Sequence, residues 1–85
     1  MEKYNPYLQA AIFEVVDNQM AAGDPPETKE TFERLLCEGF SEEDAKKLIS
    51  QAICTEIYRI GKYKEVFNRQ RYLRNLRNLP REPEE

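Results

Sequence analysis

Apolar side chains recur every three or four residues along most of this chain, the spacing that places them on one face of an α-helix. Four segments show it, and they predict helices over residues 6–22, 25–38, 42–62 and 69–79. No segment alternates apolar and polar residues with a period of two, so we expect no β-strands. The sequence therefore predicts an all-α fold, a compact bundle of four helices.

Residues that favour helix ends set these limits. A side chain able to cap free backbone amides precedes each predicted helix, and the four caps are Asn5, Asp24, Ser41 and Asn68. Behind Asp24, Glu27 stands where a carboxylate can bond back to the cap, as in a capping box. Gly23 and Gly39 can take the left-handed conformation that often ends a helix. Pro80 cannot continue the last helix.

The third predicted helix should be the central element of the bundle, because its apolar stripe is the longest. That stripe consists of Leu48, Ile49, Ala52, Ile53, Ile57 and Ile60. The stripe of the first predicted helix consists of Leu8, Ile12, Val15, Val16 and Met20. We expect residues 1–81 to form a single helical domain and residues 82–85 to form a frayed acidic tail.

Two polar residues fall in the middle of apolar stripes and should form a buried polar pair. Gln19 lies on the stripe of the first predicted helix, and Glu56 lies on that of the third. A buried carboxylate needs a partner. The candidate partners of Glu56 are Gln19 and three arginines, namely Arg34, Arg71 and Arg74. The functional alternative makes Glu56 an acid with a shifted pKa in a pocket.

The composition argues against catalysis. The chain contains no histidine, which is the commonest general base and the commonest transition-metal ligand in proteins. No Gly-rich phosphate loop and no pair of cysteines at metal-ligand spacing is present. We therefore expect a protein that is not an enzyme, with no catalytic residues, no metal site and no cofactor.

Cysteine usage and hydropathy favour a soluble cytoplasmic protein. Cys37 and Cys54 are too few for a secreted disulfide framework, and no signal peptide opens the chain. The longest uninterrupted apolar stretch, residues 10–13, is far shorter than the ~20 residues that a membrane helix needs. No contact with a membrane is expected.

Charge is distributed unevenly along the chain. Residues 1–44 hold 3 basic and 11 acidic side chains, whereas residues 45–81 hold 10 basic and 2 acidic ones, although the net charge is only −3. Such an asymmetry can indicate an anionic partner. It can equally indicate that the two halves face each other, within one chain or across a homodimer.

The basic half includes a candidate anion-binding segment, residues 59–81, in which cations alternate with aromatic residues. Its candidate residues are Arg59, Lys62, Lys64, Arg69, Arg71, Arg74 and Arg77. Cations among aromatic rings can bind phosphates and stack on bases, so a nucleic-acid-binding accessory protein is the alternative function. The negative net charge disfavours nucleic acid as a partner and favours a solvated helix face.

Several motifs resemble an uncharacterised bacterial family of small all-helical proteins, one of the domains of unknown function. They are NPYLQAAIFEVVDNQ at residues 5–19, DPPET at 24–28, LLCEGFSEEDAKKLI at 35–49 and the Glu56, Ile57, Tyr58 step. The resemblance spans most of the chain and implies an all-helical fold. Gln19 and Glu56 fall on the family's pattern.

Longer members of that family often carry histidines on the first and third helices, suggestive of a metal site. Here those regions hold Gln9 and Phe13 on the first helix and Glu43 and Lys47 on the third. The chain thus resembles a short branch without the histidines. Taken together, the sequence favours a non-catalytic binding or interaction module with an unknown protein partner, and a homodimer would fit.

Overall fold

Four α-helices make up the part of the chain that the structure, a computed structural model, describes, namely residues 6–83. They are α1 (Pro6–Ala22), α2 (Pro26–Cys37), α3 (Glu42–Tyr63) and α4 (Arg69–Asn78). Every predicted helix is present, each with ends within one residue of the prediction, and residues 6–83 contain no strand. The all-α prediction is confirmed. The expected cap Asn5 lies outside the described residues.

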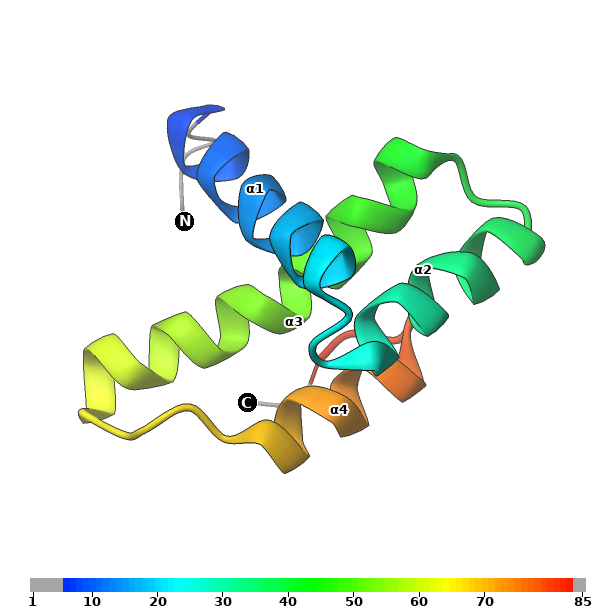
Figure 1. Cartoon of the computed structure of the whole chain (residues 1–85). Helices are drawn as coiled ribbons and strands as arrows, with labels where there is room; N and C mark the ends of the chain where they lie inside the picture. Colours follow the sequence, from blue (N-terminus) through cyan, green and yellow to red (C-terminus); the bar gives the residue numbers. More distant parts are fainter. Residues whose placement is uncertain (1–5, 84–85) are drawn as a thin grey trace.

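Helix α3 is the central element, as predicted, because it packs on the other three helices more extensively than any other helix does. In Figure 1, α1 runs across α3, while α2 and α4 pack together beside it. The C-terminal end of α3 reaches away from the other helices toward the loop that leads into α4. This end of α3 therefore has the least cover.

The core is built from the centre of each predicted stripe. Its buried apolar members are Ile12, Val16, Leu35, Ala45, Ile49, Ala52, Ile53, Tyr72, Leu76 and Leu79. Four residues that the stripes predicted to be inside are instead exposed: Leu8, Val15, Ile57 and Ile60. Helical spacing assigns a residue to a face, but a face is buried only where another helix lies over it. The three helices around α3 do not cover its last two turns.

Two of the predicted caps form as expected. The Ser41 hydroxyl accepts a hydrogen bond from the Asp44 amide at 3.1 Å, and the Asn68 side chain accepts one from the Arg71 amide at 2.9 Å. The Asp24 cap is wrong, because α2 begins one residue later, with Pro25 at the cap position and no side-chain cap bond. A residue that precedes a proline is driven toward extended backbone, so Pro25 is extended before Pro26.

Left-handed residues end the first three helices. Gly23 (φ +66°) follows α1 and Gly39 (φ +105°) follows α2, as predicted. Helix α3 ends at Lys64 (φ +59°), whose amide donates to the Ile60 carbonyl at 3.1 Å. For a residue other than glycine this conformation costs about 1–2 kcal/mol. The contacts of the following loop must therefore hold Lys64 in place. Among residues 6–83, no helix has the length and apolar character needed to cross a membrane.

The side chain of Ser50 gives a first test of the packing. Its oxygen is buried on α3 and has no hydrogen-bond partner among the described residues. We expect Ser50→Ala to raise the free energy of unfolding by about 1 kcal/mol, because it removes an unsatisfied hydroxyl and alanine is the better helix former. Urea unfolding followed by circular dichroism measures this change.

The same substitution at Ser41 is the matched control. There it removes a formed cap, so we expect a loss of about 1 kcal/mol. If Ser50→Ala also lowers stability, the Ser50 hydroxyl has a partner in solution.

Candidate functional site

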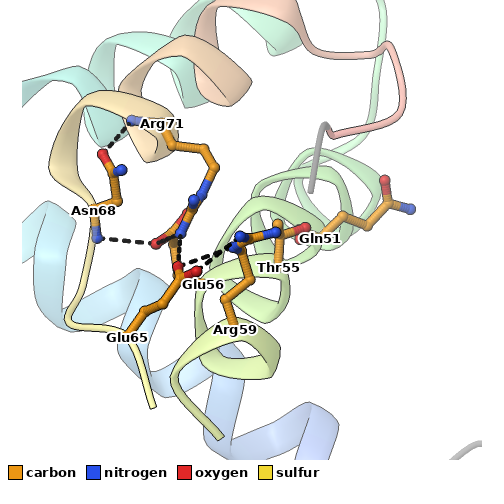
Figure 2. A network of polar contacts seen from close by, with 7 residues as sticks. All are labelled: Gln51, Thr55, Glu56, Arg59, Glu65, Asn68 and Arg71. Carbon is orange, nitrogen blue, oxygen red and sulfur yellow. Dashed lines mark hydrogen bonds and ion pairs between the residues drawn. The ribbon is translucent and has the colours of Figure 1, made fainter. Parts of the chain in front are cut away.

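A buried ion pair joins α3 to α4. The carboxylate of Glu56 is 1% exposed, and the guanidinium of Arg71 holds it through two hydrogen bonds, from Nε to Oε2 at 2.6 Å and from Nη2 to Oε1 at 2.9 Å (Figure 2). Such two-point contacts between ionised groups are the strongest side-chain hydrogen bonds in proteins. The same hydrogen bonds raise the pKa of Arg71 above its already high ordinary value. The Arg71 guanidinium therefore stays charged.

The loop between α3 and α4 is tied to the same carboxylate. The Asn68 amide donates to Glu56 Oε1 at 3.0 Å, while the Asn68 side chain caps α4 (Figure 2). Glu56 thereby receives three hydrogen bonds, one from the loop backbone and two from α4. The carboxylate fixes both where the loop runs and where α4 begins.

A second carboxylate extends this network toward the surface. Arg59 donates to both oxygens of Glu65, at 3.0 and 2.8 Å, and Arg71 Nη2 lies 3.4 Å from Glu65 Oε1 (Figure 2). These bonds, above all those from Arg59, lower the pKa of Glu65 and so keep it ionised. Two arginines and two carboxylates thus form a network without net charge.

The structure resolves which partner Glu56 takes. Of the candidates, Arg71 pairs with it, whereas Gln19 does not, so the direct pairing of Gln19 with Glu56 is wrong. The Gln19 side-chain oxygen instead accepts from Thr28 at 2.7 Å and from Tyr72 at 2.8 Å. Both residues face other helices, as their positions in apolar stripes suggested. Glu56 bonds Arg71 on α4, and Gln19 bonds Thr28 on α2 and Tyr72 on α4.

The Gln19 contacts join three helices in a second polar network. Thr28 lies on α2 and Tyr72 on α4, and their hydroxyl oxygens are 3.1 Å apart. Thr28 and Tyr72 are both fully buried. Burial raises the pKa of the Tyr72 phenol above its ordinary value, an effect that the hydrogen bonds with Thr28 and Gln19 only partly offset. Sequence reasoning missed Thr28 and Tyr72, because a hydroxyl at a stripe position gives no signal of its own.

The candidate anion-binding residues do not form one basic patch. Arg59 and Arg71 are engaged by carboxylates, and Arg69 Nη1 lies 3.7 Å from Oδ1 of Asp24, in the loop between α1 and α2. Lys62 donates to the Tyr58 hydroxyl at 2.8 Å and sits over the rings of Tyr58 and Tyr63. The remaining three, Lys64, Arg74 and Arg77, are exposed. Three of the seven cations are therefore paired with carboxylates of the same chain.

Large apolar side chains are concentrated on the surface at the far end of α3. Within residues 57–67, each of six such side chains is between 41% and 85% exposed: Ile57, Tyr58, Ile60, Tyr63, Val66 and Phe67. We call these six residues the distal surface. Sequence reasoning placed Ile57 and Ile60 in the core, since nothing in the spacing marks where the neighbouring helices stop.

A groove of about 580 Å³ lies between α1 and α3. The four positions compared above with family histidines, Gln9, Phe13, Glu43 and Lys47, all line it. The structure therefore brings these positions together, although none carries a histidine. Among residues 6–83, no three His, Cys, Asp or Glu side chains are grouped so as to hold a metal ion. Cys37 and Cys54 are exposed and form no disulfide, and Cys54 borders the groove.

Comparison of the chain with protein-family models, with curated proteins and with solved structures gave no match.

The buried ion pair predicts a non-additive mutational response. Arg71→Met leaves the Glu56 carboxylate buried without its partner, and we expect a loss of about 3–5 kcal/mol in the free energy of unfolding. Glu56→Leu should cost a similar amount. The double variant should lose less than the sum of the two, because no unpaired charge remains inside. Urea unfolding of the four proteins gives the coupling energy.

Arg77→Met is the matched control, since Arg77 lies on the same helix and is exposed. Its expected effect is within about 0.5 kcal/mol. Additive single losses would show that the pair contributes no coupling.

Burial of Tyr72 predicts a loss of stability at alkaline pH. Below pH about 10 the phenol is protonated in both folded and unfolded chains. Above it the unfolded chain releases its proton first, because the folded pKa is raised, so stability falls as pH rises. We expect Tyr72→Phe to flatten this decline between pH about 9 and 11, measured by urea unfolding. An unaltered decline in the variant would contradict the assignment.

Proposed function

We propose that this protein is a non-catalytic interaction module that binds another protein chain through its distal surface. The exposure of six large apolar side chains within residues 57–67 supports the proposal. Single exposed apolar residues are ordinary, but concentrated apolar surface is typical of interaction sites. The neutral network beneath these residues holds the loop that carries Val66 and Phe67.

The composition of the distal surface supports a protein partner. Aromatic residues and arginine are enriched where proteins bind each other, and tyrosine is prominent among the residues that contribute most to binding. Here two tyrosines pack edge to face, with ring centroids 6.3 Å apart, beside Arg59 and Lys62. Rigid rings already held by neighbours lose little entropy on binding.

A homodimer is the form of association that we propose. The charged residues that lie among those of the distal surface, within residues 57–67, are basic apart from Glu65. Residues 1–44 of the same chain are strongly acidic. Among the described residues, ion pairs between the halves join Lys46 with Asp17 at 2.8 Å, Lys47 with Glu43 at 3.4 Å and Arg69 with Asp24 at 3.7 Å. Exposed charges of both halves, such as Glu42, Asp44 and Lys64, can face a second copy.

The proposal includes three predictions made from the sequence, namely the absence of catalysis, a cytoplasmic location and membership of the bacterial family. Absence of catalysis is supported by the lack of histidine and by the engagement of both Glu56 oxygens with Arg71. A cytoplasmic location is supported by two exposed cysteines outside any disulfide. Membership of the short branch of the bacterial family is supported by the order of its motifs along the chain.

Affinity capture tests the proposal. A tagged chain is incubated with nuclease-treated host lysate and an untagged copy, and bound material is identified by mass spectrometry. Replacing Val66 and Phe67 by serine removes exposed apolar area, so we expect retention of the bound protein to fall at least about tenfold.

Tyr7→Ser is the matched control, because Tyr7 is an exposed aromatic residue on α1 outside the distal surface. It should retain the same protein as the unmodified chain. Retention of nucleic acid alone, abolished by nuclease, would replace the proposal with the nucleic-acid-binding alternative that uses residues 59–81.

A further inference from the structure

We propose that two copies of this chain pair through antiparallel α3 helices about a two-fold axis at Cys54, so that Tyr58 of each copy enters the α1–α3 groove of the other. This inference names the partner of the distal surface and rests on the proposed function. It is carried by an exposed face of α3, by the groove beside that face and by the charges along the helix.

One exposed face runs along the second half of α3. Cys54, Ile57, Tyr58 and Gly61 are spaced three, one and three residues apart, which places them on one side of a helix. All four are exposed. This is the spacing with which a helix presents apolar side chains to another helix.

Gly61 fits close contact with a second helix. Glycine is, after proline, the least favourable residue in a helix interior. Apart from its chain neighbours and the nearby backbone of α3, no described atom lies within 4 Å of the place that a Cβ at Gly61 would occupy, so packing within the described chain does not require glycine there. Close approach of another backbone would require it.

The groove between α1 and α3 can accommodate a side chain from the exposed face of a second copy. Its walls include Leu8 and Phe13 from α1 and Ser50, Gln51 and Cys54 from α3. The apolar residues can pack on an aromatic ring, while the Gln51 amide can bond a phenol hydroxyl. Cys54 belongs to both the groove and the exposed face, so one contact centred on it brings the two together.

Helix geometry places Tyr58 at the groove. Cys54 lies near the middle of α3 (Glu42–Tyr63), and each residue advances about 1.5 Å along a helix. Tyr58 is therefore about 6 Å past Cys54 along the axis. In an antiparallel partner with Cys54 facing Cys54, that level is occupied by Ser50, which lines the groove. The two-fold axis repeats the contact, as in an isologous dimer.

The charges along α3 favour this antiparallel arrangement of two copies. Lys62 and Lys64 lie about 12 and 15 Å beyond Cys54, at the end of the helix. In the partner, Asp44 lies about 15 Å from Cys54 on the other side and is level with Lys64, whereas Lys46 is level with Lys62. A parallel pair would set acidic turn against acidic turn. Antiparallel pairing instead brings Lys64 of each copy beside the acidic first turn of the other.

Sedimentation and crosslinking test the inference on the full chain. We expect the unmodified chain to be dimeric at about 100 μM. In the Cys37→Ser variant, Cys54 is the only cysteine, and a short bismaleimide should crosslink the Cys54 thiols of two copies. The Cys54→Ser variant is the matched control, because its remaining cysteine, Cys37, is exposed but should not be crosslinked between copies. Gly61→Leu should weaken dimerisation at least about tenfold, although the space around Gly61 lets leucine fit the single chain.

A charge exchange tests the direction of the helices. Lys64→Glu should weaken the dimer, and addition of Glu43→Lys to the same chain should restore it. Arg77→Leu on α4 controls for the effect of an added apolar surface residue. Circular dichroism confirms that each variant is folded.

The outcomes separate this inference from the proposed function. A chain that stays monomeric at about 100 μM, but loses a captured lysate protein when Val66 and Phe67 are replaced, overturns the pairing and leaves the interaction module standing. A dimer that persists in Gly61→Leu and is not joined through Cys54 overturns the α3 geometry.

Discussion

The carboxylate of Glu56, placed almost wholly out of water and held by Arg71, is the constraint on which the second half of this structure depends. A buried charge without a partner costs several kcal/mol, so α4 must bring Arg71 to it and the loop must bring the Asn68 amide. The entry of α4, the cap at its first turn and the course of residues 64–68 all follow from meeting that requirement.

The same requirement leaves apolar surface uncovered. Because α4 packs back against α3, the last two turns of α3 extend beyond the bundle. The loop between α3 and α4 exposes Val66 and Phe67. A chain of this length buries only about 60–65% of its unfolded surface. Covering the distal surface with another chain would add buried apolar area that the single chain cannot supply.

Some of the unevenly distributed charges pair within the chain, and others remain exposed at the two ends of α3. Inside the chain, Lys46 and Asp17 attach α3 to α1, and Arg59 and Arg71 are balanced by Glu65 and Glu56. What is left is a basic end of α3 and an acidic first turn of the same helix. That polarity matches an antiparallel copy of α3 better than it matches an extended anion such as nucleic acid.

The sequence by itself determined the helices, two of their caps, the central place of α3 and the inward direction of Gln19 and Glu56. Those features depend on the spacing of apolar residues and on local backbone chemistry, both of which are determined by residues close together in the sequence. The structure alone decided that Glu56 bonds Arg71, that Gln19 bonds Thr28 and Tyr72, and that Ile57 and Ile60 are exposed. Those features depend on which helices meet and where they end, and no local pattern encodes the crossing of one helix over another.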